Sequence, residues 1–250
     1  MKKIFTLLAI VLLSSEIVFA QKTLDMETIF RGTLNAKTIA GIRMMHSVEG
    51  YSQLSDERRQ VVAYLLPSGR QHKILADISL MHNDSVGRID DYLLSPDENK
   101  LLIQTNTEPI YRRSFRADFY VCDVASGQMH RLSSAGKQEA PVWSPDGRYV
   151  AFVRQNNIFV YDCQNQTEEQ ITHDGLQNAI INGKPDWVYE EEFGFSVAMT
   201  FDAASHYLSW IRFDESEVET YDLQMFRGMK PALEANRLYP SVYTYKYPKA

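Results

Sequence analysis

Three consecutive glutamates, Glu190 to Glu192, follow an aromatic pair in the segment DWVYEEE at residues 186–192. A row of acidic side chains is by default a solvated surface turn, because exposed charge costs little. The same carboxylates gathered in one cavity would form a clamp for a cation, since each can accept charge-assisted hydrogen bonds. Trp187 and Tyr189 place aromatic surface beside these acids, so both interpretations have to be compared with the rest of the chain.

The local sequence favours a short helix over residues 187–193. Asp186 is a suitable N-cap residue, and Gly194 is suited to the position that ends a helix. On a strand two adjacent glutamates would point to opposite faces, whereas on a helix they lie about 100° apart and can reach into one cavity. We therefore predict a helical insertion before a β unit, with Trp187 and Tyr189 packing it against its neighbours.

A repeated pattern surrounds this segment. Each copy has a polar turn, a strand of aliphatic and aromatic residues, a loop and a second strand that ends near an aspartate, and Pro96 and Pro145 occupy matching turns. A period of about 40–50 residues with several strands per repeat is typical of propeller blades, which must stack because one blade cannot bury both of its faces. The repeats are LLSPDENKLLIQTN (93–106) with DFYVCDVASGQMHRLSS (118–134), VWSPDGRYVAFVRQN (142–156) with NIFVYDCQNQTEEQIT (157–172), MTFDAASHYLSWIRFDE (199–215) with EVETYDLQMF (217–226), and a weaker unit at 59–77.

The predicted fold is therefore all-β, a partial β-propeller of about four blades with the acidic helix inserted. A β-sandwich is the alternative, but the turn that recurs in register before an apolar strand favours the propeller. Four blades could form a small closed ring or half of a larger one. In the third repeat FDAA (201–204) stands where a Ser-Pro-Asp turn is expected, which should weaken that turn and leave the blade intact.

The first twenty residues have the features of a cleaved signal sequence. MKK is basic, IFTLLAIVLL is apolar, and Val18 and Ala20 suit a cut before Gln21. A buried N-terminal helix is the alternative. We expect residues 1–20 to be a signal peptide, residues 21–250 to be the mature chain, and the protein to be exported to the periplasm or secreted by a bacterium. No other run is long enough to suggest a membrane span.

Composition and the remaining reactive residues exclude several functions. The net charge of −6 and the absence of a basic stripe argue against nucleic-acid binding. The six histidines are scattered and the sequence has no CxxC or HExxH motif, so we expect no metal and no cofactor. Cys122 and Cys163 occupy matching strands of successive repeats, where sheets about 10 Å apart do not favour a bridge, and we predict two free thiols.

Five stretches resemble the N-terminal propeller of the dipeptidyl peptidase IV family of serine exopeptidases. DWVYEEE is the most specific of them, and the resemblance extends over nearly all of residues 24–250. The others are LDMETIFRGT (24–33), IYRRSFRADFYVCD (110–123) and the C-terminal stretches IRFDESEVETYDLQMF (211–226) and VYTYKYPKA (242–250). This resemblance implies an eight-bladed propeller joined to an α/β-hydrolase domain, and removal of dipeptides from peptide N-termini, usually after proline or alanine.

The resemblance also implies substrate-binding residues. Matched to the family motif, Glu191 and Glu192 would bind the free amine of the substrate, and Arg112 would help to hold a substrate carbonyl, with Arg113 as the near alternative. The implied partners are peptide N-termini, together with a separate hydrolase domain or a second copy of the chain.

One departure from the family concerns catalysis. No G-x-S-x-G nucleophile elbow occurs in these 250 residues, so no catalytic residue is assigned and we expect the hydrolase domain to be absent and the chain alone to be inactive. The leading hypothesis is the substrate-recognition propeller portion of a dipeptidyl peptidase IV-like aminopeptidase. The alternatives are a stand-alone exported propeller that binds peptides or a partner protein, and a decayed gene product whose open blade edges favour aggregation.

Overall fold

The computed structural model describes residues 25–32, 41–80, 86–225 and 241–247. The chain divides into two compact units, Met1–Ile39 and Ala40–Ala250. The described part of the first unit holds one short helix, α2 (Met26–Phe30), whose first turn is capped by Asp25 through a 2.6 Å bond from the Thr28 N–H. The predicted signal peptide lies outside the described residues. None of the helices within them has the length and hydrophobicity that a membrane crossing needs.

The compact unit Ala40–Ala250 begins with a four-stranded antiparallel meander, which we call the first β unit. Buried and half-buried residues alternate along β2, as expected of a strand with one face on a core. A side chain at Gly50 would bring its Cβ within 2.2 Å of the Tyr64 carbonyl on the paired strand, so this position requires glycine. The hairpin predicted at 59–77 is confirmed. The elements are β1 (Arg43–Met45), β2 (Gly50–Leu54), β3 (Gln60–Leu65) and β4 (Gln71–Asp77), followed by the 3-10 helix η2 (Ile78–Leu80).

The second and third β units are the two clearest repeats of the sequence, and both are antiparallel meanders. They join in one eight-stranded sheet because the start of β9 pairs with β7, Arg116 opposite Glu139 and Ala117 opposite Gln138. The second β unit contains β5 (Asp91–Leu94), β6 (Lys100–Pro109), β7 (Phe115–Asp123) and β8 (Met129–Arg131). The third contains β9 (Gln138–Trp143), β10 (Tyr149–Arg154), β11 (Asn157–Asp162) and β12 (Thr167–Gln170).

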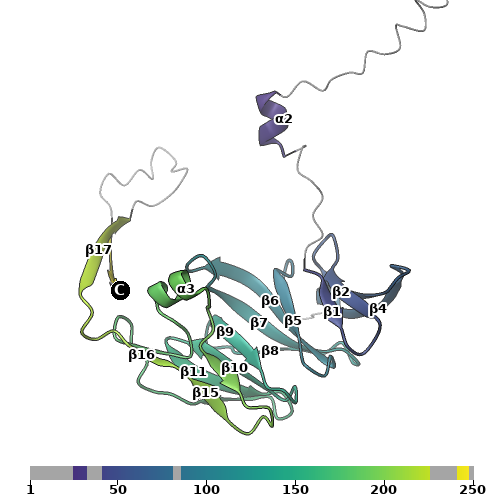
Figure 1. Cartoon of the computed structure of the whole chain (residues 1–250). Coiled ribbons are helices and arrows are strands. Elements are labelled where there is room, and N and C mark those ends of the chain that lie inside the picture. Colours follow the sequence, from purple (N-terminus) through teal and green to yellow (C-terminus); the bar gives the residue numbers. More distant parts are fainter. Residues whose placement is uncertain (1–24, 33–40, 81–85, 226–240, 248–250) are drawn as a thin grey trace, which may run out of the picture. The chain divides into compact units, whose positions relative to one another are not determined.

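The fourth β unit differs from its predicted form. The segment 217–226 was expected to return to the sheet as the second strand of the third repeat, and this is wrong: it pairs over six residues with the strand after 240. Strand β16 occupies the place beside β13, and every residue of β17 is exposed, including the apolar Tyr221, Leu223 and Met225. The elements are β13 (Ile180–Asn182), helix α3 (Trp187–Phe193), β14 (Met199–Phe201), β15 (Leu208–Trp210), β16 (Arg212–Asp214), and the hairpin β17 (Thr220–Met225) and β18 (Ser241–Lys246) (Figure 1).

One polar turn precedes a strand in each of the four β units. A side-chain oxygen at the first turn position accepts a hydrogen bond from the backbone N–H five residues later, at 2.7 to 3.1 Å. The backbone N–H of the first turn residue in turn donates to the carbonyl of that later residue, at 2.9 Å in every copy. Asp202 supplies this oxygen in the third repeat, so FDAA keeps the turn that was expected to be weakened. The four residues are Ser55, Ser95, Ser144 and Asp202.

Replacement of Ser144 by alanine is expected to lower the free energy of unfolding by about 1–2 kcal/mol, because the Tyr149 N–H loses its partner in a buried turn. Urea unfolding measures the effect. Ser216→Ala removes an exposed hydroxyl that hydrogen-bonds to the exposed Asp214 carboxylate, and it should stay within about 0.5 kcal/mol of the parent. Equal effects of the two substitutions would contradict the structural role of the turn.

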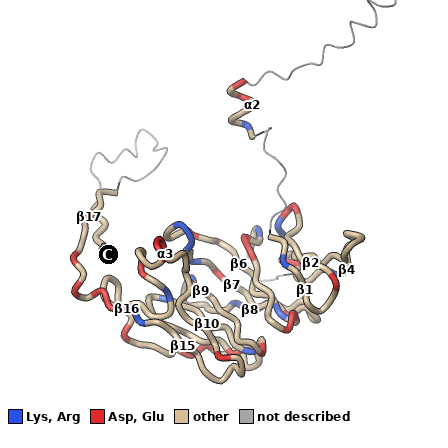
Figure 2. Tube along the Cα trace, in the orientation of Figure 1, with Lys and Arg blue, Asp and Glu red and all other residues tan. Residues whose placement is uncertain are grey.

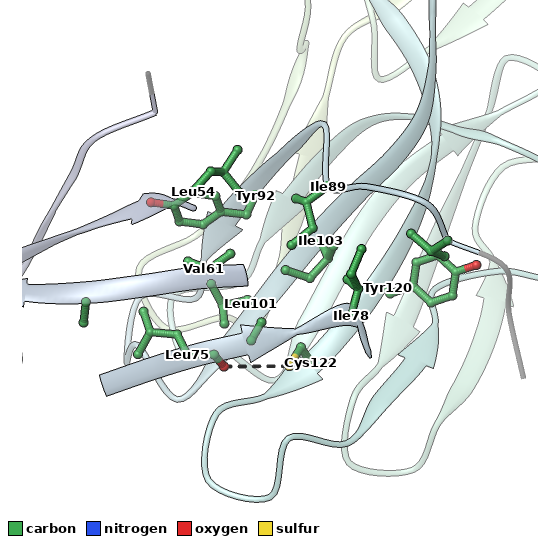
Figure 3. Close-up of a cluster of buried hydrophobic side chains, with 13 residues drawn as sticks. Leu54, Val61, Leu75, Ile78, Ile89, Tyr92, Leu101, Ile103, Tyr120 and Cys122 are labelled. Carbon is green, nitrogen blue, oxygen red and sulfur yellow. Dashed lines mark hydrogen bonds between the residues drawn. The ribbon is translucent and has the colours of Figure 1, made fainter. Parts of the chain in front are cut away.

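Three hydrophobic clusters lie between consecutive β units. Along β10, Val150 and Phe152 pack toward the second β unit, whereas Ala151 and Val153 pack toward the fourth β unit. This strand is therefore buried on both faces. Figure 3 shows the first cluster, in which side chains of β2, β3 and β4 meet those of β5, β6 and β7. Each β unit thus supplies one wall of the next core, which confirms the expectation that one unit cannot bury both faces alone.

The two cysteines are free thiols that belong to these cores. Cys122 is buried in the first cluster and its Sγ–H points to the Leu75 carbonyl oxygen at 3.9 Å. Cys163 packs against the second cluster. Burial raises the pKa of each thiol to about 12, which makes both poor nucleophiles.

Candidate functional site

The acidic segment forms helix α3, over the residues that the sequence predicts. The Asp186 carboxylate accepts a hydrogen bond from the Tyr189 N–H at 2.8 Å and so caps the first turn. Gly194 has φ of 76° and donates its N–H to the Glu190 carbonyl, which ends the helix. An L-residue with a side chain is strained at this φ, so glycine favours the termination.

The aromatic residues of the segment hold the helix on both sides. The Tyr189 ring lies 5.0 Å from Phe213 and 5.2 Å from Phe193, and the Trp187 ring stacks on Tyr247 at 5.1 Å. These contacts tie α3 to the strand β16 and to the residue that follows β18. The packing role predicted for Trp187 and Tyr189 is therefore present in the structure.

The loop of residues 110–114 reaches α3 from the second β unit. Strands β6 and β7 are ten and nine residues long, and this length carries the connecting loop to the acidic helix (Figure 1). The Ile110 N–H closes the loop by donating to the Ser114 carbonyl at 2.9 Å. The loop displays Arg112 and Arg113 beside the helix.

Glu190, the first of the three acids, fixes the loop to the helix. Its side chain is one of the largest that are fully buried, and its Oε1 accepts hydrogen bonds from the backbone N–H of Arg113 at 2.7 Å and of Ser114 at 2.9 Å. No role was predicted for Glu190 from the sequence. Its spacing of three residues from Trp187, which puts both on one helix face, is the signal that could have indicated burial.

Arg112 and Glu191 form a two-point ion pair at the helix surface. Arg112 Nη2 lies 2.9 Å from Glu191 Oε1, and Arg112 Nε donates to Glu191 Oε2 at 3.1 Å. The side chain of Arg112 is 71% exposed and that of Glu191 is 28% exposed. Arg113 instead donates to the Glu190 backbone carbonyl at 3.4 Å. The structure thus brings Arg112, rather than Arg113, to the Glu191 carboxylate. Figure 2 shows basic and acidic positions of the chain next to one another at α3.

Glu192 is exposed and, among the described residues, has no hydrogen-bond or ion-pair partner. An exposed ion pair such as Arg112–Glu191 contributes about 0–1 kcal/mol to stability, because water solvates both charges. The arrangement therefore adds little to folding. It presents one carboxylate already oriented by a guanidinium and a second one without a partner, side by side on a capped helix.

A cavity of about 300 Å³ lies under the loop and is lined mainly by apolar side chains. Glu190, Tyr111 and Ser114 contribute polar atoms to it, and the Ser114 Oγ is buried without a hydrogen-bond partner. Burial, and then the neighbouring Tyr243, Glu215 and Glu190, raise the pKa of Tyr111 to about 12. Within the described ranges no group of three His, Cys, Asp or Glu residues is arranged to hold a metal ion.

The comparison with protein-family models decides the family. Residues 95–250 match the model described as the dipeptidyl peptidase IV (DPP IV) N-terminal region. The chain belongs to the dipeptidyl peptidase IV family. The matched range covers the second β unit from the turn after β5, the third and fourth β units, and all three residues assigned from the resemblance, Arg112, Glu191 and Glu192.

Curated proteins of similar sequence carry the same family name. Dipeptidyl peptidase 4 of Trichophyton tonsurans is 35% identical over 162 residues, which are 64% of this chain and 20% of that protein. Dipeptidyl aminopeptidase B of Saccharomyces cerevisiae is 31% identical over 179 residues, 71% of this chain and 21% of that protein. The chain therefore spans about a fifth of the length of these DPP IV relatives.

The fold agrees with this assignment. The crystal structure of Porphyromonas gingivalis dipeptidyl peptidase 4 matches with a TM-score of 0.82 and 40% sequence identity, over 92% of this chain and 32% of that one. The antiparallel sheets of the chain thus correspond to the β-propeller region of a DPP IV enzyme.

Proposed function

We propose that the chain is the substrate-recognition part of the propeller of a dipeptidyl peptidase IV-like serine aminopeptidase. Glu191 and Glu192 bind the free N-terminal amine of a peptide, and Arg112 holds a substrate carbonyl. The observation that carries the proposal is the contact between Arg112 and Glu191, which come from two different β units 79 residues apart, on a helix that Glu190 fixes in place. The four β units act as a rigid support, in the proposal one part of a larger propeller.

The chemistry of the site suits a peptide N-terminus. An α-amino group has a pKa near 8, so it is mostly cationic at pH 7 and offers three N–H donors. Each carboxylate oxygen of Glu191 has a second lone pair besides the one used by Arg112, and Glu192 has both oxygens free to accept. An internal peptide bond carries no charge, so the two glutamates select chain ends.

The exposure of the site limits its strength. Charge pairs in contact with water contribute about 0–1 kcal/mol each, whereas a lower dielectric strengthens them severalfold. Tight binding therefore depends on covering the site with further protein, and in the proposal the catalytic domain of the enzyme provides that cover. The proposal also places the protein outside the cytoplasm, in the periplasm or medium, as the N-terminal signal pattern predicts.

A pair of peptides that differ only at the amine tests the proposal. At pH 7 we expect an Ala-Pro peptide with a free N-terminus to bind about tenfold more tightly than the same peptide N-acetylated, as measured by calorimetry or by amide chemical shifts. The preference should disappear in the double variant Glu191→Gln/Glu192→Gln and persist in Glu217→Gln, which changes an exposed glutamate elsewhere. Equal affinity for both peptides would rule out the glutamate clamp.

A further inference from the structure

Glu215 is a buried carboxylate outside the proposed substrate site. Its residue is 8% exposed, and its backbone is fixed by a 2.7 Å bond from its N–H to the Ala179 carbonyl and by a 3.0 Å bond that its own carbonyl accepts from Val218. Its side chain makes no hydrogen bond or ion pair with the described residues. Removing a carboxylate from water without giving it a partner is costly, so such a group requires an explanation.

The Glu215 side chain lines a cavity of about 430 Å³. This volume is large enough for a small organic group. The walls include parts of β7 and β9, the loop after β6, the start of α3 and strand β18, and they carry four aromatic rings and two further acids. These residues are Tyr111, Trp187, Tyr243, Tyr245, Glu139 and Asp186.

The positive charges of the cavity wall are already engaged. Lys184 forms an ion pair with Glu139 at 2.5 Å, and Arg116 pairs with Glu108 at 2.6 Å. The Lys246 ammonium donates to the Ser216 and Val218 backbone carbonyls. The carboxylate of Asp186 uses one oxygen for the helix cap. The negative charge of Glu215 is thus left without a counter-charge in direct contact.

We propose that this cavity binds an organic ammonium group, such as a primary alkylamine or a lysine side chain, with Glu215 as its charge partner. The carboxylate accepts hydrogen bonds from the N–H groups of the ammonium. The aromatic rings contact the alkyl chain of the ligand, and their faces attract its positive charge. Burial and the neighbouring Asp186 carboxylate raise the pKa of Glu215 to about 7, and a bound cation would reverse this effect.

The site is distinct from the proposed peptide clamp. Arg112, Glu191 and Glu192 are absent from the residues that line the cavity. Substitutions that abolish amine binding at the clamp should therefore leave ammonium binding at Glu215 unchanged. The result of testing one proposal does not decide the other.

The test uses n-butylammonium as the probe and butan-1-ol as its neutral control. With the carboxyl carbons of glutamate labelled with ¹³C, we expect n-butylammonium to shift the Glu215 signal saturably at pH 8, and butan-1-ol to leave it unchanged. The apparent dissociation constant should rise at least about tenfold in Glu215→Gln, followed through the amide signals of the cavity walls. It should stay within about twofold of the parent in Glu217→Gln and in Glu191→Gln.

A second readout needs no variant. The pKa of Glu215, measured by NMR titration of the parent protein, should fall when n-butylammonium is added and should not change with butan-1-ol. A signal that does not saturate, equal responses to the amine and the alcohol, or unchanged binding in Glu215→Gln would each overturn the proposal. A lower pKa with saturable binding that Glu215→Gln abolishes would support it.

Discussion

Replacement of Glu190 by alanine is expected to lower the free energy of unfolding by about 2–4 kcal/mol. The substitution leaves the N–H groups of Arg113 and Ser114 without the carboxylate oxygen that both now share, and an unsatisfied buried donor costs about 1–3 kcal/mol. It also leaves a space in a place where the parent side chain is fully buried. Urea unfolding of the parent and the variant gives the difference.

The neighbouring acid provides the matched control. Glu192→Ala removes the same atoms from the same helix at an exposed position, so it should change stability by less than about 0.5 kcal/mol. Glu190→Gln keeps one acceptor oxygen and should fall between the two. Hydrogen exchange of the Arg113 and Ser114 amides should quicken in Glu190→Ala alone. If the two alanine variants unfold at the same urea concentration, Glu190 does not fix the loop.

Local chemistry explains why so much of the fold could be predicted. The polar turn uses a side-chain oxygen at a fixed spacing, and that spacing is visible in the sequence as Ser-Pro-Asp before an apolar strand. Helix α3 was predicted with its boundaries because Asp186 and Gly194 act on the adjacent backbone. Such features depend on a few neighbouring residues, so the sequence alone is sufficient to recognise them.

The pairing of β17 with β18 could not be predicted in the same way. Both segments have the composition of strands, but whether β17 pairs with a strand of residues 199–215 or with β18 depends on which sheet edge is already occupied. That choice is made by residues distant in the sequence. The alternation of apolar residues, which identifies a strand, does not identify its partner.

The three acids of DWVYEEE show the same limit within the site. They are identical in type, yet Glu190 is buried, Glu191 pairs with Arg112 and Glu192 has no partner in the described chain. The family resemblance assigned Glu191, Glu192 and Arg112, and the structure places two of these in contact. The resemblance could not indicate Glu190, because the burial of that residue depends on where the loop of a separate β unit lies.

The titration of Glu215 gives the second large effect, a loss of stability between pH 5 and pH 8. Its pKa is about 7 in the folded protein and near 4.5 in the unfolded chain, so the folded state binds more protons within this interval. The stabilising contribution is complete below the unfolded pKa and is lost as the pH rises through the folded pKa. At 1.36 kcal/mol for each pKa unit, the loss between pH 5 and pH 8 is about 2–3 kcal/mol.

Burial and the charged groups around Glu215 together determine the size of this pKa shift. Desolvation is the main cause and the Asp186 carboxylate adds to it, whereas Lys246 and Lys184 act in the opposite direction. Burial raises the pKa of Tyr111 to about 12 and also raises the pKa of Tyr245, so both side chains stay neutral in this interval. The charged and titratable groups that line the same cavity are Asp186 at the N-cap of α3, Lys184 before it, Tyr111 on the loop after β6, Arg116 on β7, Glu139 on β9, and Tyr243, Tyr245 and Lys246 on β18.

Glu215→Gln isolates the contribution of this one carboxyl. Glutamine keeps the shape but cannot ionise, so the variant should gain about 2–3 kcal/mol relative to the parent as the pH is raised from 5 to 8. Urea unfolding at several pH values measures both proteins, and Glu217→Gln, an exposed position two residues away, should show no pH-dependent difference from the parent. A constant offset between Glu215→Gln and the parent across this range would mean that Glu215 is already ionised at pH 5 in the folded protein. The carboxylate would then already be stabilised by a positive charge in the free protein. Its burial would carry no electrostatic cost that a bound ammonium could relieve.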